Sequence, residues 1–372
     1  PIRAAIRDWK GIDFRLGEVT GVDFQKRLVR LKDGVLPYDY LVLAAGGATH
    51  YFGMKSIETF SFDLKSLDQS ESLRNHIIES FERATIETDP EKRRALLTFV
   101  ITGGGPAGVE FAGALKELID HELSRDFPTL DMAESRVMLL EGRDALLAFL
   151  PESQRLYTKK RLEDMGIEVR FNTQVSGAEP GKILLGDGSG ISACTMVWTA
   201  GVQAAPLAAE LGLPRGANGR IRVREDLSIE DHPDVFAIGD IAFLEQDGRP
   251  LPMVAPVAMQ GGTYVAEAVI NRIKGRPASP FRYHDKGNMA TIGRNSAVAY
   301  TFGMKYSGFI AWVLWLFLHL MYLVGFRNRL MVLLNWGFYY FHRAMQVRII
   351  SGSTPVGGKG CSQPQASDVR TP

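Results

Sequence analysis

The 372-residue sequence predicts an α/β fold with two related units and an apolar helical segment near its C-terminus. Three observations predict this fold. A buried-strand pattern ends in a glycine cluster and continues as a helix, one β-rich arrangement occurs twice, and residues 309–326 form a long apolar run.

The glycine cluster follows residues 96–102, an apolar and β-branched run that is typical of a buried parallel strand. Gly103, Gly105 and Gly108 are spaced as G-x-G-x-x-G. In this pattern the first glycine permits a tight turn, the second lets backbone approach a pyrophosphate, and the third lets helix pack on strand. Pro106 suits the first turn of a helix, whose free N–H groups favour phosphates. The pattern therefore predicts a Rossmann-like dinucleotide-binding unit.

A second strand, residues 136–141, ends in Glu141, whose carboxylate would accept the ribose hydroxyls of the adenosine half. Glu141 follows Gly103 by 38 positions, more than the usual ~20. The crossover helix is therefore expected to be long or to be followed by a loop, as Phe127-Pro128 suggests. The alternative is a glycine-rich turn that holds no ligand.

Composition excludes several classes of function. A net charge of +1 without a basic stripe argues against nucleic acid as a partner. The two cysteines, Cys194 and Cys361, are far apart in the sequence, so they indicate neither a disulfide framework nor a metal site.

The repeated arrangement is a β-meander that leads into a buried strand and a small-residue turn. In the first copy Asp33-Gly34 precedes strand 38–45 and Gly46; in the second Asp187-Gly188 precedes strand 191–199 and Gly201. The second copy follows the glycine cluster at Gly103–Gly108. If the first copy followed a glycine cluster at the same distance, that cluster would lie upstream of Pro1. We therefore expect the first βαβ unit of a two-nucleotide enzyme to be missing from this chain.

Other helices and strands are predicted from the periodicity of apolar residues and from the residues that typically begin or end such elements. Residues 66–86, 152–165 and 259–273 are expected to be helical, and residues 167–171 to form a strand. Strand 235–238 ends in Gly239-Asp240, an acidic residue well placed for ligand hydroxyls. Asp240 as a simple helix N-cap is the alternative.

The C-terminal apolar run contains His319 as its one clearly polar residue. Its 18 residues just reach the length of a spanning-helix candidate. Residues 330–341 are aromatic-rich and too short to span, and the flanking arginines suit an interfacial anchor. The alternatives are a single spanning helix and a buried helical hairpin in a dimer interface. Residues 351–372 are expected to be a disordered tail.

With these motifs in place, the sequence resembles the type II NADH dehydrogenases, the single-subunit, non-pumping NADH:quinone oxidoreductases. The resemblance extends to about residue 350. It depends on five stretches: 36–42, 103–114, 198–202, 235–241 and 325–329. It implies two nucleotide-binding domains, with the NADH domain inserted into the FAD domain, and a C-terminal membrane-anchoring segment.

The resemblance also implies roles for particular residues. NADH would be held by Gly103, Gly105, Gly108 and Glu141, and Glu110 would lie near the nicotinamide as a catalytic residue. Asp240 would bind the ribityl or phosphate region of FAD, and Ala45 and Gly46 would pass beside the flavin. Gly201 and Gly239 are further candidate cofactor-binding residues.

The quinone-side motif of the family corresponds to residues 255–262. Gln260 matches it and is a candidate catalytic residue, whereas Pro256 and Gly261 depart from it. His284 and His319 are expected to be structural.

The domain boundaries expected from this resemblance are 1–95 and 206–305 for the FAD domain, 96–205 for the NADH domain, and 306–350 for the anchor. The implied partners are NADH, a membrane quinone, the lipid bilayer surface and a second copy of the chain. The implied location is the cytoplasmic face of the cell inner membrane, with peripheral or monotopic attachment.

Three other readings are weighed against this one. A disulfide-using flavoenzyme, of the glutathione reductase or sulfide:quinone oxidoreductase type, would need paired redox cysteines. A soluble NADH-dependent reductase of a protein electron carrier would not need residues 309–341. An inactive NADH-binding fragment would lack flavin.

Overall fold

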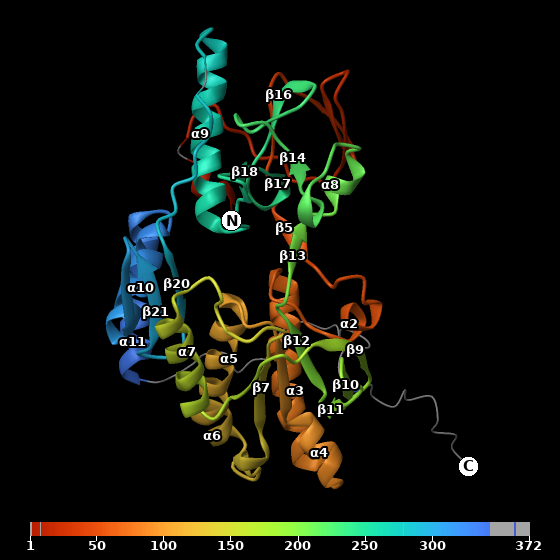
Figure 1. Ribbon diagram of the computed structural model, residues 1–372, viewed down its shortest axis with the longest axis vertical. Coiled ribbons are helices and arrows are strands. Elements are labelled where there is room, and N and C mark those ends of the chain that lie inside the picture. Colours follow the sequence, from red (N-terminus) through yellow and green to blue (C-terminus); the bar gives the residue numbers. More distant parts are fainter. Residues whose placement is uncertain (1, 8, 278, 343–360, 362–372) are drawn as a thin grey trace, which may run out of the picture. The chain divides into compact units, whose positions relative to one another are not determined.

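The structure is a computed structural model, and it describes residues 2–7, 9–277, 279–342 and 361 (Figure 1). The chain divides into two compact units: residues 1–50 with 202–286, and residues 51–201 with 287–372. These boundaries differ from the expected ones because Phe62, Leu73 and Val298 share a core with the strand that precedes the glycine cluster. The helices after residue 51 and the C-terminal strands therefore belong with the glycine-loop sheet.

The second unit is built on a four-stranded parallel sheet in the order β12-β6-β7-β8. These strands are Thr195–Trp198, Thr98–Thr102, Arg136–Leu140 and Glu168–Arg170. Every residue of β6 is buried, as expected of a central parallel strand. The carboxyl ends of all four strands lie at one edge of the sheet.

The crossover from β6 to β7 is the long helix that the spacing predicts. Helix α5 (Pro106–Leu118) continues through a π-helical turn, η1 (Ile119–Leu123), into α6 (Ser124–Asp126). Its buried face carries apolar side chains at helical spacing, among them Val109, Leu115 and Ile119. The extra turns before Phe127 account for the distance between Gly103 and Glu141.

The remaining helices of this unit match the predicted ones closely. Helix α3 (Leu67–Ile86) begins after Ser66, whose side chain accepts a hydrogen bond from the Gln69 N–H. Helix α7 is Glu152–Asp164. Two short helices, α2 (Lys55–Phe60) and α4 (Pro90–Leu96), and the 3-10 turn η2 (Met132–Glu134) complete the set.

Both copies of the predicted meander are present. The first is β1 (Val19–Asp23), β2 (Leu28–Leu31) and β3 (Gly34–Pro37), and the second is β9 (Val175–Glu179), β10 (Lys182–Leu185) and β11 (Gly190–Ser192). Each is antiparallel. Each is followed by a strand that joins a parallel pair: β4 (Leu41–Leu43) pairs with β16 (His232–Ala237), and β12 with β6. The predicted strands 38–45 and 191–199 were too long, and the second is divided into β11 and β12.

The first unit places β4 and β16 parallel, with β15 (Ser228–Ile229) on the other side of β16. Helix α9 (Ala255–Ile273) begins four residues earlier than predicted. The other elements of this unit are α1 (Ile2–Ile6), β5 (Gly47–Thr49), β13 (Val202–Ala204), α8 (Leu207–Glu210), η3 (Ala217–Gly219), β14 (Ile221–Arg222), η4 (Gly239–Ile241), β17 (Ala242–Phe243), β18 (Glu245–Gln246) and β19 (Arg249–Pro250).

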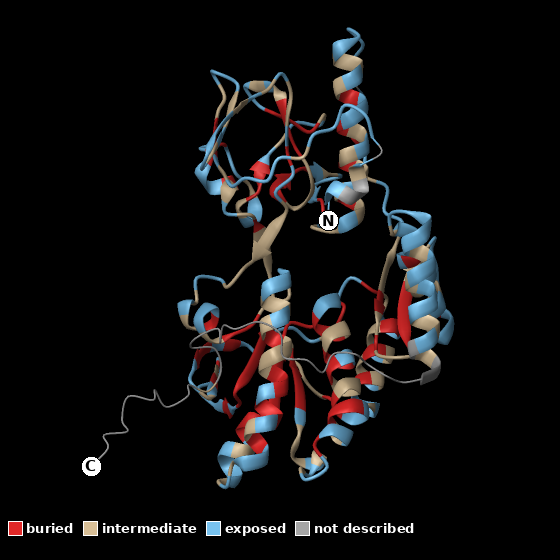
Figure 2. Cartoon of the chain, turned by 180° about the vertical axis from the view of Figure 1, so that it is seen from behind, coloured by how far each residue is buried: buried red, intermediate tan, exposed pale blue. Residues whose placement is uncertain are grey.

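The C-terminal part of the second unit is a three-stranded antiparallel sheet with two apolar helices. The strands are β20 (Asn288–Thr291), β21 (Ala297–Thr301) and β22 (Met304–Gly308). Most of the apolar run forms α10 (Phe309–Tyr322), and α11 (Phe326–His342) contains the aromatic-rich residues 330–341. An extended Leu323 and a left-handed Gly325 separate them. Figure 2 shows that much of the surface of both helices is exposed.

Among the described residues, none of the helices combines the length and the apolar character needed to cross a bilayer. The expected disordered tail lies outside the described residues, except for Cys361.

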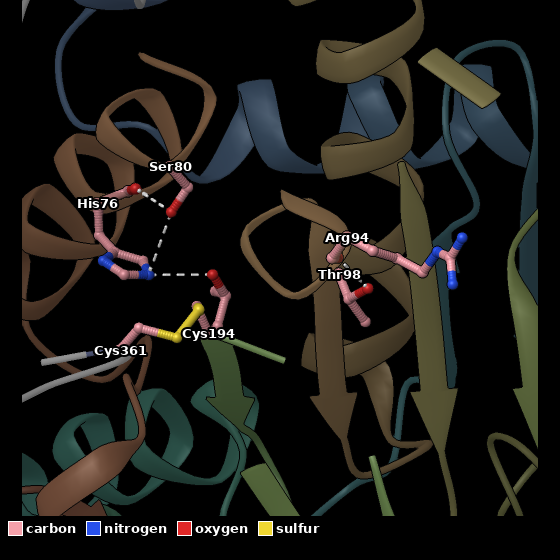
Figure 3. The surroundings of a disulfide bond; sticks show 7 residues. His76, Ser80, Arg94, Thr98, Cys194 and Cys361 are labelled. Atoms are coloured by element: carbon pink, nitrogen blue, oxygen red, sulfur yellow. Dashed lines mark hydrogen bonds between the residues drawn. A yellow bond between two sulfur atoms is a disulfide. The ribbon is translucent and has the colours of Figure 1, made fainter. Parts of the chain in front are cut away.

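The cysteines correct one expectation from the sequence, since Cys194 and Cys361 form a disulfide (Figure 3). No sequence pattern indicates this disulfide, because 167 positions separate the two cysteines. Cys194 lies just before β12, whereas Gly201 lies beyond the carboxyl end of that strand. The disulfide is therefore about 20 Å of extended chain away from the glycine-loop edge, which argues against a disulfide-using flavoenzyme.

Candidate active site

The glycine loop has the geometry that dinucleotide binding requires. Gly103 has a φ of +112°, and a Cβ there would lie 2.8 Å from the Ala200 Cα. A Cβ on Gly108 would lie 1.9 Å from the Gly103 carbonyl oxygen. Gly105 differs, because a Cβ there would meet no atom within 4 Å. The first and third glycines are thus fixed by packing, and the second faces open space that a pyrophosphate can use.

Glu141 closes this loop from the end of β7. Its carboxylate accepts hydrogen bonds from the Gly104 N–H at 2.6 Å and from the Arg143 N–H at 2.8 Å. Both oxygens are therefore held at the tip of the loop, beside the N-terminus of α5. This is the position from which a carboxylate reaches ribose hydroxyls and repels an additional phosphate.

The turn that contains Gly201 lies at the same edge. The Thr199 hydroxyl donates to the Thr102 carbonyl at 2.9 Å and also contacts the Gly103 carbonyl at 3.2 Å. The structure therefore brings Gly103, Gly108, Glu141 and the turn before Gly201 together.

The first unit has a comparable edge. Gly46 follows β4 and Gly239 follows β16, and both have left-handed φ values, +69° and +71°. The Gly46 carbonyl accepts from the Ala205 N–H at 3.1 Å. A Cβ on Gly47 would lie 3.1 Å from the Asp240 Cβ, so Asp240 packs against the turn that contains Ala45 and Gly46. The predicted residues Ala45, Gly46, Gly239 and Asp240 therefore lie together at the carboxyl ends of two parallel strands, where ligands of α/β sheets bind.

Glu110 lies on α5 within the second unit. Its Oε1 accepts from the Thr291 N–H of β20 at 3.0 Å. Burial raises the pKa of the Glu110 carboxyl above its ordinary value, although hydrogen bonds from Thr291 and the charge of His319 lower it in part.

A cavity of about 710 Å³ begins at Glu110 and Thr291. One face of α5 contributes Ala114 and Glu117, and the rest of the wall is largely apolar and aromatic. It includes Phe309, Trp312, Trp315, Leu316, Leu333 and Trp336 from α10 and α11. The cavity is therefore an apolar and aromatic site with ionisable side chains in part of its lining, namely Glu110, Glu117, His121, Glu122 and Arg294.

Gln260 lies in the other unit, on α9. Its side-chain amide donates to the His284 carbonyl and accepts from the His284 N–H, each at 3.0 Å. In this structure Gln260 holds the backbone at His284, and its catalytic role stays a prediction. His319 bonds through Nδ1 to the Trp315 carbonyl at 2.7 Å.

Sequence reasoning missed three contributors to the site. Gly104 occupies a variable position of the pattern, yet a Cβ there would lie 2.8 Å from Glu141 Oε2. The run of three consecutive glycines was the available signal. Thr291 and the aromatic wall of the cavity had no signal, because only folding brings residues 291–340 onto α5. No group of three or more metal-ligating side chains occurs among the described residues.

Two family models match the chain. The model described as pyridine nucleotide-disulphide oxidoreductase matches residues 6–262, and the NDH2 C-terminal domain model matches residues 285–343. The second match covers β20–β22, α10 and α11.

Known proteins are similar over most of the chain. A type II NADH:quinone oxidoreductase of Mycobacterium tuberculosis, NdhA, is 38% identical over 92% of this chain and 76% of its own length. A type II NADH:quinone oxidoreductase of Staphylococcus haemolyticus is 32% identical over 83% of this chain and 76% of its own length. The structure of Plasmodium falciparum NDH2 with NADH has the same fold, with a TM-score of 0.82 and 17% identity over 90% of this chain and 85% of that one.

Proposed function

The chain belongs to the type II NADH:quinone oxidoreductases, and from this premise we propose how its own residues perform that reaction. The enzyme oxidises NADH and reduces a quinone through FAD, without pumping protons. Bound FAD supplies the redox chemistry, because it accepts a hydride from NADH and passes electrons to the quinone. The protein supplies binding, orientation and proton handling.

The observation that carries the proposal is the contact of Glu141 with the glycine loop. Gly103, Gly105 and Gly108 would let the NADH pyrophosphate approach backbone N–H groups at the start of α5. Glu141 would accept the ribose hydroxyls and disfavour NADPH. The glycine-loop sheet within residues 96–205 is accordingly proposed as the core of the NADH domain, and residues 51–95 pack with it.

The residues of the first unit fit the sugar and phosphate side of FAD. Gly46 and Gly239 leave backbone close to the edge, and Asp240 offers a carboxylate for hydroxyl groups. We assign Ala45, Gly46, Gly239 and Asp240 to this role, and the first unit, residues 1–50 with 202–286, to the FAD domain. Gly201, at the glycine-loop edge of the second unit, is proposed as a further cofactor-binding residue there.

The cavity next to Glu110 suits a quinone, which has an apolar body and two oxygens that need protons on reduction. The raised pKa of Glu110 lets its carboxyl hold a proton at a higher pH than an ordinary glutamate does. Glu110, which was expected near the nicotinamide, is thus proposed instead as the proton donor to the quinone. Gln260 lies in the first unit, and its catalytic role is a separate proposal.

Residues 306–350 are proposed as a monotopic attachment to the cytoplasmic face of the inner membrane. The described part has exposed apolar side chains along α10 and α11, including Ile310, Phe317 and Leu334. Residues 287–342 contain four Lys and Arg but no Asp or Glu, which favours an anionic lipid surface. A homodimer is proposed as well, and the mass of the protein in detergent tests it.

Measuring the two half-reactions separately under anaerobic conditions tests these assignments. NADH should bleach the flavin absorbance, and quinone should restore it. Glu141→Gln should slow the first step about tenfold at low NADH and narrow the preference over NADPH, because a charged hydrogen bond is lost. Glu110→Gln should slow the second step about 100-fold and leave the first unchanged.

The control variant is Glu152→Gln, a change at the exposed start of α7. It should leave both half-reactions as they are. An unchanged NADH/NADPH ratio in Glu141→Gln would remove Glu141 as the selector. Normal reoxidation in Glu110→Gln would remove Glu110 as the proton donor.

A further inference from the structure

The turn between β21 and β22 places a bulky apolar side chain where the backbone disfavours one. Thr301 pairs with Met304, so Phe302 and Gly303 form a two-residue loop with φ values of +50° and +75°. A two-residue hairpin loop with both φ values positive favours Asn-Gly or Asp-Gly, and a left-handed φ is costly for a bulky residue. Phe302 is nevertheless 85% exposed, the largest fraction among the large hydrophobic side chains of the described residues.

The ends of α10 and α11 lie at the same end of the sheet as this turn. Helix α10 starts directly after Gly308 and packs on β21 and β22, so it runs back toward the turn (Figure 1). Its length is about 21 Å, against about 17 Å for β22. The Trp312 and Tyr340 rings lie 5.8 Å apart, so α11 returns antiparallel to α10. Phe326, the first residue of α11, is therefore at the turn end.

This end of the unit has an apolar surface with basic residues beside it. We call it the apolar tip, and it consists of Phe302, Met304, Tyr322, Val324 and Phe326, all exposed. The exposed basic residues next to it in sequence are Lys305 and Arg327. Because residues 287–342 contain no carboxylate side chain, no acidic group of this segment offsets their charge.

We propose that the apolar tip inserts into the interface of an anionic lipid bilayer, with the Phe302 turn as an insertion point additional to the two helices. This deepens the membrane attachment proposed above. Lipid is favoured over a second copy of the chain because two basic tips would repel each other, whereas phosphate headgroups attract Lys305 and Arg327. Burial in lipid would also offset the cost of an exposed Phe in a left-handed conformation.

The test is the partition of Phe302→Asn between solution and sedimented vesicles of phosphatidylcholine with phosphatidylglycerol. Asn-Gly is the dipeptide that this turn favours, so the melting temperature should not fall. Partition should be about fivefold weaker than for the original chain, because one apolar side chain no longer inserts. Phe302→Trp should restore it.

Two further variants serve as controls. One tests whether loss of any exposed apolar side chain weakens partition, and the other tests whether binding depends on anionic lipid. Ile86→Asn removes a side chain that is 81% exposed at the end of α3 and should leave partition unchanged. Lys305→Gln should weaken partition about fivefold on vesicles with phosphatidylglycerol and have little effect on phosphatidylcholine alone.

The outcomes distinguish this inference from the proposed attachment itself. If the original chain binds vesicles and Phe302→Asn binds equally well, the insertion of the turn is overturned while attachment by α10 and α11 stands. If the original chain binds no vesicle, attachment fails and the inference fails with it. If Phe302→Asn lowers only the mass of the protein in detergent, the tip is a contact between copies and the inference is overturned.

Discussion

Gly105 and Gly108 belong to one motif, but glycine is needed at the two positions for different physical reasons. Substitution of each by alanine distinguishes these reasons. Gly108→Ala would force a Cβ to within 1.9 Å of the Gly103 carbonyl, so we expect a loss of several kcal/mol of stability or no folded protein. Gly105 has a φ of −75° and open space at its Cβ. Gly105→Ala should therefore cost about 1 kcal/mol or less in unfolding free energy.

The same Gly105→Ala variant should raise the KM for NADH about tenfold, because the methyl group occupies the space proposed for the pyrophosphate. Thermal melting and NADH kinetics check the pair of variants. A Gly105→Ala enzyme with an unchanged KM would show that the pyrophosphate does not approach this residue.

The buried carboxyl of Glu110 makes the stability depend on pH. Its folded-state pKa is raised, so the ionised form is disfavoured in the folded protein. The penalty is absent below the ordinary carboxyl pKa and grows as the pH rises to the raised folded value. The original chain should therefore lose stability as the pH rises through this range, whereas Glu110→Gln should not. The unfolding free energy of Glu110→Gln minus that of the original chain should be smallest at acid pH, increase with pH and then level off. Denaturant melts across this range measure it, and a difference independent of pH would contradict the raised pKa.

At the scale of the element, the sequence predicted where strands and helices lie better than where they end. Residues 38–45 and 191–199 read as continuous strands because their residues are apolar, yet β4 is only Leu41–Leu43 and β12 starts after Cys194. The separation of α10 from α11 was signalled by Gly325 and by Arg327 and Arg329 just after it, but not the residue at which each helix ends. Hydrogen-bond partners, which composition does not reveal, set these limits.

The disulfide between Cys194 and Cys361 could not be predicted from the sequence. It joins the residue before β12 to Cys361, and the loop that it closes spans 167 positions of the sequence. Breaking it enlarges the unfolded ensemble, so the unfolding free energy should fall by about 2–5 kcal/mol. A dithiol reductant and the Cys361→Ser variant should lower the melting temperature equally, and the reductant should not affect the variant further. If thiol titration finds both cysteines reduced and the melting temperature is unchanged, the disulfide has no stabilising role.

At the scale of the whole molecule, duplication and the apolar C-terminal run were predictable because both are patterns of the chain itself. The two meanders and the two parallel pairs follow from the repeat. The cavity beside Glu110 was not predictable, because residues of α5, β20, α10 and α11 line it and more than 170 positions separate Glu110 from Thr291. Sequence could thus suggest a lipid-facing segment but not the cavity it forms with α5.

Loss of membrane attachment should lower turnover with a quinone that is dissolved in the bilayer, but not turnover with a water-soluble quinone. Ile310 and Leu334 are 63% and 58% exposed and lie outside the cavity lining, so glutamate at both positions leaves the cavity wall intact. The double variant Ile310→Glu, Leu334→Glu should leave the membrane pellet, because carboxylates at the interface oppose insertion and meet anionic lipids.

Turnover of this variant with a long-tailed quinone in vesicles should fall about tenfold, since the quinone stays in the bilayer that the enzyme has left. Turnover with a water-soluble short-chain quinone should stay within about twofold, because the proposed flavin and NADH sites lie on other elements. Ile273→Glu, at the exposed end of α9, is the matched control and should change neither activity. A double variant that stays with the membrane and keeps both activities would show that α10 and α11 are not the attachment.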